Sequence, residues 1–418
     1  MSTHNLLMVL LLFPAAGLRA QEPPADTTAA ARLERAERTI ELLQAQVAEL
    51  AAARVESRSR RRVELSGRVL VNAFFNNGKV NNSDVPQFVL PPDPPGLPAS
   101  AAGASARQSQ MALTTFVPNV AGAEFTGEVD ADFFGGQQPS SGGRTFPLMR
   151  LRRLRAELTW PHAWLLIGQE APPMAELNPS SLGQVGFTAF AGSGNLWLWI
   201  PQIRAGIEAG STLRIGLEAS ALAPTTGDPQ DLFATQPDRA ERSRRPYTQG
   251  RVRVRWDQSG TSGEVSLGGH YGWLAITEST LVVSKAAAAS ALLAVGPVEL
   301  RAEGFTGQAL GGLGGGAIGQ SLGPGSRAVR TRGGWAQLNL KPRTGWEIGG
   351  GYGLDDPEDG DLNPLTSRLK NVAWESHLHW RPQPLVLGIE FRRFETTYGL
   401  GVGALFVNHV NVAAGFEF

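Results

Sequence analysis

The chain has 418 residues, with 50 glycines, 28 prolines and no cysteine, and its formal net charge at pH 7 is zero. This length suits one large β domain or two ordinary domains. The lack of cysteine excludes thiol catalysis, thiolate metal sites and disulfides, and the zero net charge gives no support for nucleic-acid binding. Beyond the N-terminus, no apolar run reaches the length of about 18 residues that a membrane-spanning helix needs.

Residues 1–20 are predicted to be a secretory signal peptide. Leu6–Phe13 form an apolar run that is too short to span a bilayer, Pro14 follows it, and Ala20 offers a small residue at a cleavage point. The segment lacks an N-terminal Lys or Arg, and the alternative is a short membrane-associated terminus.

Residues 21–62 are predicted to form a periplasmic coiled-coil oligomerisation segment with a basic linker. Apolar residues recur every seven positions in two registers, as the a and d positions of three heptads do: Leu33, Ala36, Ile40, Leu43, Val47 and Leu50. A helix of about 20 residues is marginal alone in water, so it needs partners. The alternative is a single amphipathic helix that packs on the following domain or plugs it. The Arg-rich run 58–62 is interpreted as a linker near lipid headgroups.

Residues 63–418 are predicted to be all-β and to form a sixteen-stranded antiparallel transmembrane β-barrel. Alternating segments of about ten residues are separated in turn by tight turns and long loops, which is the plan of an outer-membrane barrel. The predicted strands are 63–76, 107–117, 122–134, 147–160, 163–170, 196–209, 212–222, 249–257, 263–272, 286–295, 298–307, 333–341, 345–353, 371–381, 385–396 and 410–418. The pattern leaves the strand number open to within two.

Several predicted strands have one charged face. In 249–257, Val252, Val254 and Trp256 alternate with three arginines. Because an arginine at the lipid midplane costs roughly 2–4 kcal/mol, the charged face is expected to line the lumen. The predicted inward arginines lie on four strands and are Arg153, Arg155, Arg204, Arg214, Arg251, Arg253 and Arg255. Such a column attracts anions and repels cations.

The alternative to an anion-selective column is a balanced lumen with weak selectivity. This alternative is favoured by four acidic residues that also face inward on or beside these strands, namely Glu157, Glu208, Glu218 and Glu264.

Loop 171–195 follows the fifth predicted strand, the place where a loop of sixteen-stranded porins folds into the lumen. It is predicted to constrict the pore, with the N-terminal helix as a competing candidate for that role. Its candidate polar side chains are Glu176, Asn178, Ser180 and Ser181. The alternative is a loop on the external surface.

No metal site, cofactor or enzymatic activity is expected. His377 and His379 lie two apart on one strand face, but no third ligand is evident beside them. The acidic loop 354–370 lacks the EF-hand spacing. The chain contains no nucleophile elbow or other catalytic motif.

The chain ends in a strictly alternating strand with two terminal aromatic residues, Phe416 and Phe418. This ending is typical of bacterial outer-membrane barrels, and the barrel assembly machinery recognises it. Lipid and lipopolysaccharide of the outer membrane are therefore expected to surround the barrel, with residues 21–62 in the periplasm.

The whole arrangement resembles the DcaP-type trimeric outer-membrane channels. The resemblance lies in the heptad segment, in Leu151–Gln169, in Trp197–Arg204 and in the Phe418 ending. It implies a homotrimer and passive uptake of small anionic solutes such as dicarboxylates. Phosphate-selective porins share the architecture and are the near alternative, followed by a general porin. Alternatives of another class are a barrel enzyme, such as a lipase, and a structural or adhesive protein.

Overall fold

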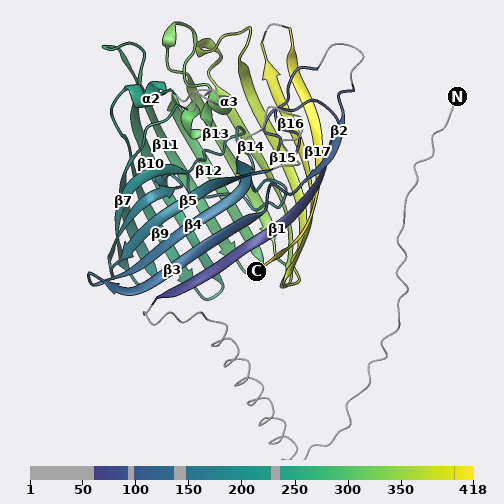
Figure 1. Ribbon diagram of the computed structural model, residues 1–418. Coiled ribbons are helices and arrows are strands. Elements are labelled where there is room, and N and C mark those ends of the chain that lie inside the picture. The colour runs from purple at the N-terminus through teal and green to yellow at the C-terminus, as the bar shows by residue number, and fades with distance from the viewer. Residues whose placement is uncertain (1–60, 93–97, 136–146, 227–235, 400) are drawn as a thin grey trace, which may run out of the picture. The chain divides into compact units, whose positions relative to one another are not determined.

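The computed structural model describes residues 61–92, 98–135, 147–226, 236–399 and 401–418, which form one closed antiparallel β-barrel (Figure 1). The predicted signal peptide and coiled coil lie outside the described residues. No helix of the described part is long and apolar enough to cross a membrane.

Consecutive strands lie side by side around the wall. Their bounds are β1 (Arg62–Asn76), β2 (Ala101–Ser105), β3 (Gln110–Val120), β4 (Ala123–Gly135), β5 (Leu148–Thr159), β6 (Ala163–Glu170), β7 (Ile200–Gly210), β8 (Leu213–Leu222), β9 (Tyr247–Gln258), β10 (Thr261–Ala275), β11 (Leu281–Val295), β12 (Val298–Gln308), β13 (Arg330–Leu340), β14 (Trp346–Pro357), β15 (Arg368–Trp380), β16 (Leu385–Tyr398) and β17 (Gly403–Glu417). The described helices are short: α2 (Arg239–Arg242), α3 (Gly315–Gly319), η1 (Pro173–Ala175), η2 (Gly311–Leu313), η3 (Pro324–Ser326) and η4 (Asp359–Asp361).

The barrel has sixteen strand positions, because β2 and β3 share one. Both pair with β1: β2 with its second half, from Asn72 on, and β3 with its first half, up to Arg68. The predicted sixteen-stranded antiparallel barrel is therefore confirmed. The short β2 was missed, since it lies inside the predicted long loop 77–106.

Strand β17 closes the ring on β1. Arg68 Nε donates a hydrogen bond of 2.9 Å to Oε1 of Glu417, and the backbone of Gly67 exchanges hydrogen bonds with that of Phe418. Closure matters because a strand edge with unpaired backbone groups is not tolerated in lipid. Phe416 and Phe418 are exposed at this seam, and their role in assembly stays a prediction.

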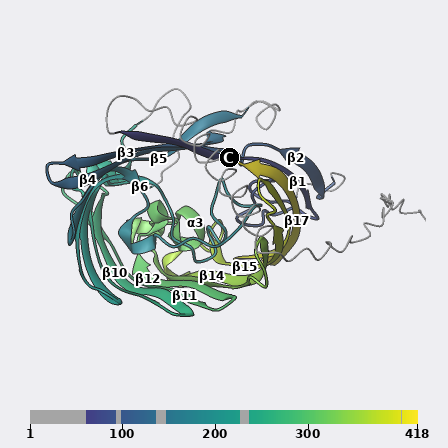
Figure 2. The same ribbon diagram turned by 90° about the horizontal axis from the view of Figure 1, so that it is seen from below.

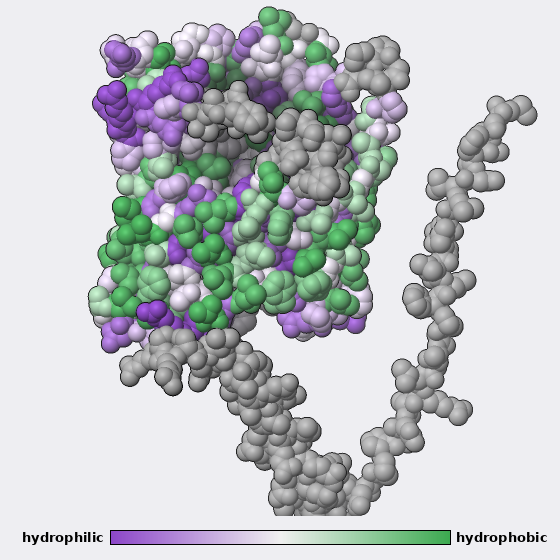
Figure 3. Space-filling model, viewed as in Figure 1, coloured by the Kyte–Doolittle hydropathy of each residue, from purple (hydrophilic) through white to green (hydrophobic). Residues whose placement is uncertain are grey.

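The outer face of the wall is apolar. Large aliphatic residues from neighbouring strands are exposed on it, among them Ile203, Ile207, Ile215, Leu217, Val252 and Leu267. Figure 3 shows such residues spread over the wall, with strongly hydrophilic residues gathered toward its upper end. An apolar face of this extent is typical of a barrel surrounded by lipid.

Short turns connect the strands at one end of the barrel, and most of the long connections lie at the other (Figure 1). Two connections predicted to be long are short, because their strands extend further than predicted. These are 273–285, where only 276–280 separate β10 from β11, and 397–409, where β16 and β17 nearly meet. Conversely, residues 196–199 were predicted to be strand and belong to a loop.

Three long connections fold into the barrel. In 77–92, the carbonyl of Val89 accepts a 2.7 Å hydrogen bond from the hydroxyl of Tyr398 on β16. Segments 171–199 and 309–329 contact each other, because the Trp197 N–H donates a hydrogen bond to the carbonyl of Leu313. Figure 2 shows α3, part of the last segment, inside the ring of strands. These segments bury an apolar cluster that includes Leu196, Leu222, Tyr247, Phe305, Leu310 and Leu313.

A buried ion pair fixes the first of these segments. Arg107 Nη2 lies 2.6 Å from Oδ1 of Asp84, and both side chains are almost fully buried. Asp84→Ala would leave the guanidinium buried without its partner, at a cost of about 3–5 kcal/mol. We expect segment 77–92 to become sensitive to protease in this variant. The double variant D84A/R107A should recover much of the resistance; equal resistance of D84A and the unaltered protein would contradict the prediction.

Candidate functional site

Loop 171–199 crosses the inside of the barrel and reaches the far wall. Ser180 N–H donates a 2.7 Å hydrogen bond to Oε1 of Gln337 on β13. Ser181 Oγ donates a 2.9 Å bond to Oε2 of Glu390 on β16. The carbonyl of Leu182 accepts from Asn72 Nδ2 on β1 at 2.9 Å. The loop therefore lies within the lumen and not on the external surface.

The glycine-rich strand β14 makes room for the returning part of this loop. The ring of Phe190 stacks on Trp335 with 6.0 Å between centroids. A Cβ at Gly351 or Gly353 would come within 2.7–2.8 Å of the Phe190 ring. Gly194, with φ of +95°, lies so close to the wall that a Cβ would be 2.2 Å from the carbonyl oxygen of Gly334. Small residues at these positions allow the loop to pack against the strands.

Glu176 attaches the start of the loop to the arginine-bearing wall. One carboxylate oxygen lies 2.9 Å from Arg204 Nη1 on β7, and the other contacts Arg251 on β9. Burial raises the pKa of Glu176, but the charges of Arg251 and Arg204 outweigh it and hold the pKa below its ordinary value of 4.5. Nearby, the carbonyl of Asn178 accepts a 3.0 Å hydrogen bond from Arg301.

The structure brings together all seven arginines that were predicted to line the lumen, and each makes an ion pair with a carboxylate. On β5, Arg153 and Arg155 contact Glu128 at 2.6 and 3.0 Å. On β9, Arg251 and Arg253 contact Glu218 at 2.8 and 2.9 Å. The remaining pairs are Arg204 with Glu176, and Arg214 and Arg255 with Glu208. The lumen face is therefore a network of both signs, not an isolated cationic column.

Within this network, some arginines are more exposed than their partners. The side chains of Arg153 and Arg155 are 32% and 27% exposed, whereas those of Glu128 and Glu170 are 9% and 7% exposed. On β5, the guanidinium groups thus face the water and the carboxylates lie behind them. Arg251 and Arg204 are only 3% and 2% exposed, so a solute in the lumen has little access to them.

Sequence alternation missed two inward arginines of β5, Arg150 and Arg152, and the acidic strand β4. A bulge in the β4–β5 pairing, between Asp130 and Ala131, lets the consecutive residues Arg152 and Arg153 both contact Asp130. The acidic residues of β4 alternate as Glu128, Asp130 and Asp132 and pair with the arginines of β5. The alternate spacing of these acidic residues is visible in the sequence. The bulge interrupts the period-two pattern of β5 and cannot be recognised from the sequence.

Two cavities lie beside the loop, each of about 350 Å³. The first is lined by Arg152, Arg153 and Arg155 of the wall and by loop residues from Glu176 to Val185. The second lies toward the short-turn end and is lined by Arg204, Arg253, Arg255 and several glutamates. Arg155 and Glu176 line both cavities, so the two meet between the wall and the loop.

Comparison with known proteins is informative at the level of structure. No protein-family model matches the chain, and no curated protein sequence matches it. The outer-membrane channel DcaP of Acinetobacter baumannii superposes with a TM-score of 0.64 at 18% identity, over 87% of this chain and 99% of that one. The barrel has the fold of outer-membrane porins. The predicted resemblance to DcaP-type channels is confirmed for the fold.

Other porin-type barrels give the same result. An anion-selective porin from Comamonas acidovorans has a TM-score of 0.55 at 14% identity, over 86% of this chain and all of the other. The outer-membrane protein OmpT of Vibrio cholerae has a TM-score of 0.53 at 9% identity, over 87% and 100% of the two chains. At these identities the similarity is one of architecture, and the charged passage has to be interpreted from its own residues.

The contacts of Glu176 predict how the loop responds to charge removal and to pH. A group whose pKa is depressed in the folded protein stabilises it above the ordinary pKa and loses that effect as pH falls through the depressed value. We therefore expect steady single-channel currents above pH 4.5, and added current noise only below that pH.

Glu176→Gln should show the added noise already at pH 7. The matched control is Glu157→Gln, which removes an inward carboxylate that contacts Arg155 at 3.6 Å on the same wall. Noise of the same size in both variants would contradict a specific role of Glu176 in holding the loop.

Proposed function

We propose that this protein is a passive diffusion channel of the bacterial outer membrane that prefers small anionic solutes such as dicarboxylates. The observation that carries the proposal is the exposure of Arg153 and Arg155 to a cavity whose other wall is the inward loop. A guanidinium group binds a carboxylate or phosphate through two parallel hydrogen bonds. The porin fold and the apolar outer face support the outer-membrane location.

The preference for anions is expected to be moderate. The arginines of the network are matched by carboxylates such as Glu128 and Glu218, so the wall as a whole is not strongly cationic. Selection then depends on which charges a solute can reach, because screening limits each charge to short range and the carboxylates paired with Arg153 and Arg155 are less exposed than the guanidinium groups. We therefore propose that the exposed arginines attract anions toward the passage and do not form a tight binding site.

A phosphate-selective or general porin would use the same passage. Phosphate and dicarboxylates differ in size and charge. The extent to which each one reduces the chloride current would show which of them the channel prefers. Lipopolysaccharide around the barrel and recognition of Phe416 and Phe418 by the assembly machinery remain predictions.

The enzyme alternative has one contact in its favour, in which His270 Nε2 lies 3.0 Å from Ser284 Oγ. Both side chains are buried inside the barrel, and the second ring nitrogen faces the amide of Gln249, not a carboxylate. The hydroxyl also donates to the carbonyl of Ala309. A lipase-type site would need an accessible nucleophile, so we propose no catalytic activity.

Planar-bilayer recording in a KCl gradient tests the channel and its selectivity. We expect open channels with a reversal potential that indicates faster permeation of Cl⁻ than of K⁺. A lack of channels would contradict the proposal and favour the structural or adhesive alternative. Channels that pass K⁺ faster than Cl⁻ would contradict the anion preference alone.

The double variant R153Q/R155Q should lower the ratio of Cl⁻ to K⁺ permeability more than R251Q/R253Q does, because the second pair is far less exposed. Reversal potentials of the two variants in the same gradient give this comparison. Arg332→Gln is the control, since this exposed arginine contacts Asp356 and lines neither cavity. Equal shifts in the two double variants would show that exposure does not determine the filter.

We also propose that three copies associate, with residues 21–62 forming the coiled coil. Deletion of 21–61, which ends before the first residue of β1, should convert trimers into monomers in mild detergent while the barrel still folds. Size-exclusion chromatography with light scattering measures the mass, and heat-dependent mobility in gel electrophoresis reports barrel folding. If trimers persist after the deletion, the coiled-coil prediction is contradicted and the barrel walls hold the three copies together.

A further inference from the structure

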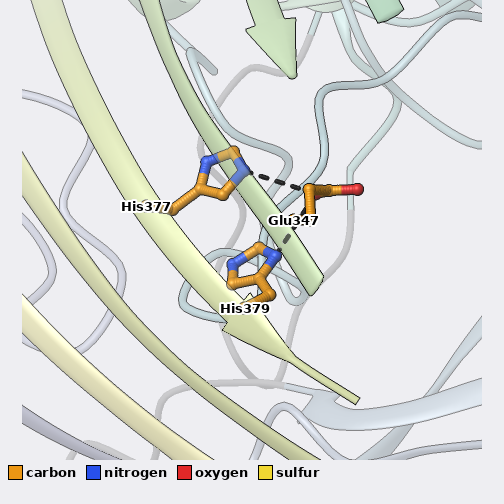
Figure 4. A group of neighbouring side chains, drawn as sticks. All are labelled: Glu347, His377 and His379. Carbon is orange, nitrogen blue, oxygen red and sulfur yellow. Dashed lines mark ion pairs between the residues drawn. The ribbon is translucent and has the colours of Figure 1, made fainter. Parts of the chain in front are cut away.

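A second cluster of ionisable side chains lies away from the charged passage, on β14 and β15. Glu347 pairs in register with His379, and Gly349 pairs with His377, so all these positions face the lumen. Figure 4 shows both imidazole rings beside the carboxylate of Glu347. From the sequence alone, the two histidines had no evident third ligand. The pairing of β14 with β15 brings Glu347, which lies 30 residues before His377, beside them.

Two ring nitrogens converge on one carboxylate oxygen. His377 Nε2 and His379 Nδ1 each lie 3.3 Å from Oε1 of Glu347. Both histidine side chains are fully buried, and apart from this contact with Glu347 neither nitrogen has a partner or makes a well-formed hydrogen bond. Buried polar atoms without partners are uncommon in native structures and often mark the place of an ion or water.

The opposite nitrogen of each ring is held by a carboxylate. His377 Nδ1 lies 3.3 Å from Glu375, and His379 Nε2 lies 3.0 Å from Glu390. When these nitrogens carry the ring protons and donate them, the lone pairs lie on the two nitrogens near Glu347. A carboxylate behind a histidine, fixing its tautomer and orientation, is the usual arrangement around a metal-binding imidazole.

We propose that Glu347, His377 and His379 form a binding site for a divalent transition-metal ion such as Zn²⁺. Two imidazoles and a carboxylate are ligands that suit this ion, with bonds of about 2.0–2.2 Å. Ligands on a tetrahedron of that size are separated by roughly 3.3 Å, which is the nitrogen–oxygen separation found here. The rings are stacked with centroids 4.3 Å apart, so one ring rotates when both nitrogens bind the ion.

The charges around the cluster favour a dication. Glu347, Glu375 and Glu390 contact the two imidazoles, and Arg392 lies 2.6 Å from Glu375 and 2.8 Å from Glu390. When both imidazoles bind a metal they are neutral, and the three carboxylates and one guanidinium around them then carry a net charge of −2. Lys341 is 3.8 Å from Glu347 but lies closer, at 2.7 Å, to Glu299. A divalent ion would balance the remaining charge.

The strand also provides space and a further oxygen. A Cβ at Gly349 would lie 2.6 Å from His377 Nε2 and 2.3 Å from Oδ1 of Asn339. This Asn339 oxygen is buried and lacks a hydrogen-bond partner. It could accept from a water on the ion, which would complete the coordination. Any side chain at 349 would close this space.

The site would link the wall to loop 171–199. Ser180 Oγ donates to Oε1 of Glu347, and Ser181 donates to Glu390, the carboxylate behind His379. A bound ion would fix Glu347 and the two rings and so stiffen the wall to which the loop is attached. Metal binding should therefore reduce the current noise of the open channel, in addition to raising the thermal stability of the barrel.

Metal binding to the folded full-length protein in detergent tests the proposal. We expect one Zn²⁺ per chain by equilibrium dialysis at pH 7.5, and Co²⁺ absorption bands typical of tetrahedral coordination by nitrogen and oxygen. Binding should weaken as pH falls, because protons compete with the metal for the ligand atoms. The variants H379Q and E347Q each remove a ligand and should weaken Zn²⁺ binding by more than the roughly 10-fold that loss of an outer partner costs.

His270→Gln is the matched control, because this buried inward histidine contacts Gln249 and Ser284 and no carboxylate. It should leave Zn²⁺ binding unchanged. Folding of every variant is checked by heat-dependent gel mobility; where H379Q fails to fold, Gly349→Ala, which keeps all three ligands and fills the space, should abolish binding. The lack of a bound ion at 100-fold molar excess of Zn²⁺, or binding that H379Q, E347Q and G349A leave intact, would overturn the proposal.

Discussion

The structure depends on one constraint, which is that every backbone N–H and C=O group in contact with lipid must be paired within the protein. A sheet meets this condition only when its last strand pairs with its first, and here β17 pairs with β1 from Arg68 to Asn76. Closure then forces side chains alternately into lipid and lumen. The apolar outer face and the charged inner face are two consequences of the same backbone requirement.

A ring of sixteen strands encloses more space than its own side chains fill. Loops 77–92, 171–199 and 309–329 occupy much of this space, and the buried pair Arg107–Asp84 and the cluster around Phe305 hold them there. The passage is what these loops leave open. The proposed selectivity would therefore depend on loop placement as much as on the wall, because the loops determine which arginines meet water.

The sequence predicts the barrel well because alternation is local. The strand positions, the inward side of Arg153 and Arg255, and the tight turns all follow from period two. Features that depend on neighbours distant in the sequence were not predictable in the same way. The bulge at Arg152 breaks the period, β2 is too short to show one, and the acidic partners of the arginines come from strands whose pairing register had to be known. Glu347 beside His379 is another case of register.

Loop 171–199 connects two kinds of wall. At Glu176 it contributes a negative charge to arginines of β7 and β9, and at Ser180 it donates a hydrogen bond to a carboxylate of β14. The arginine wall and the histidine-rich wall are thus coupled through one segment of chain. A metal ion bound on the histidine side would change how firmly the loop is held. That change would reach Arg155 and Glu176, where the two cavities meet, without any direct contact between the two walls.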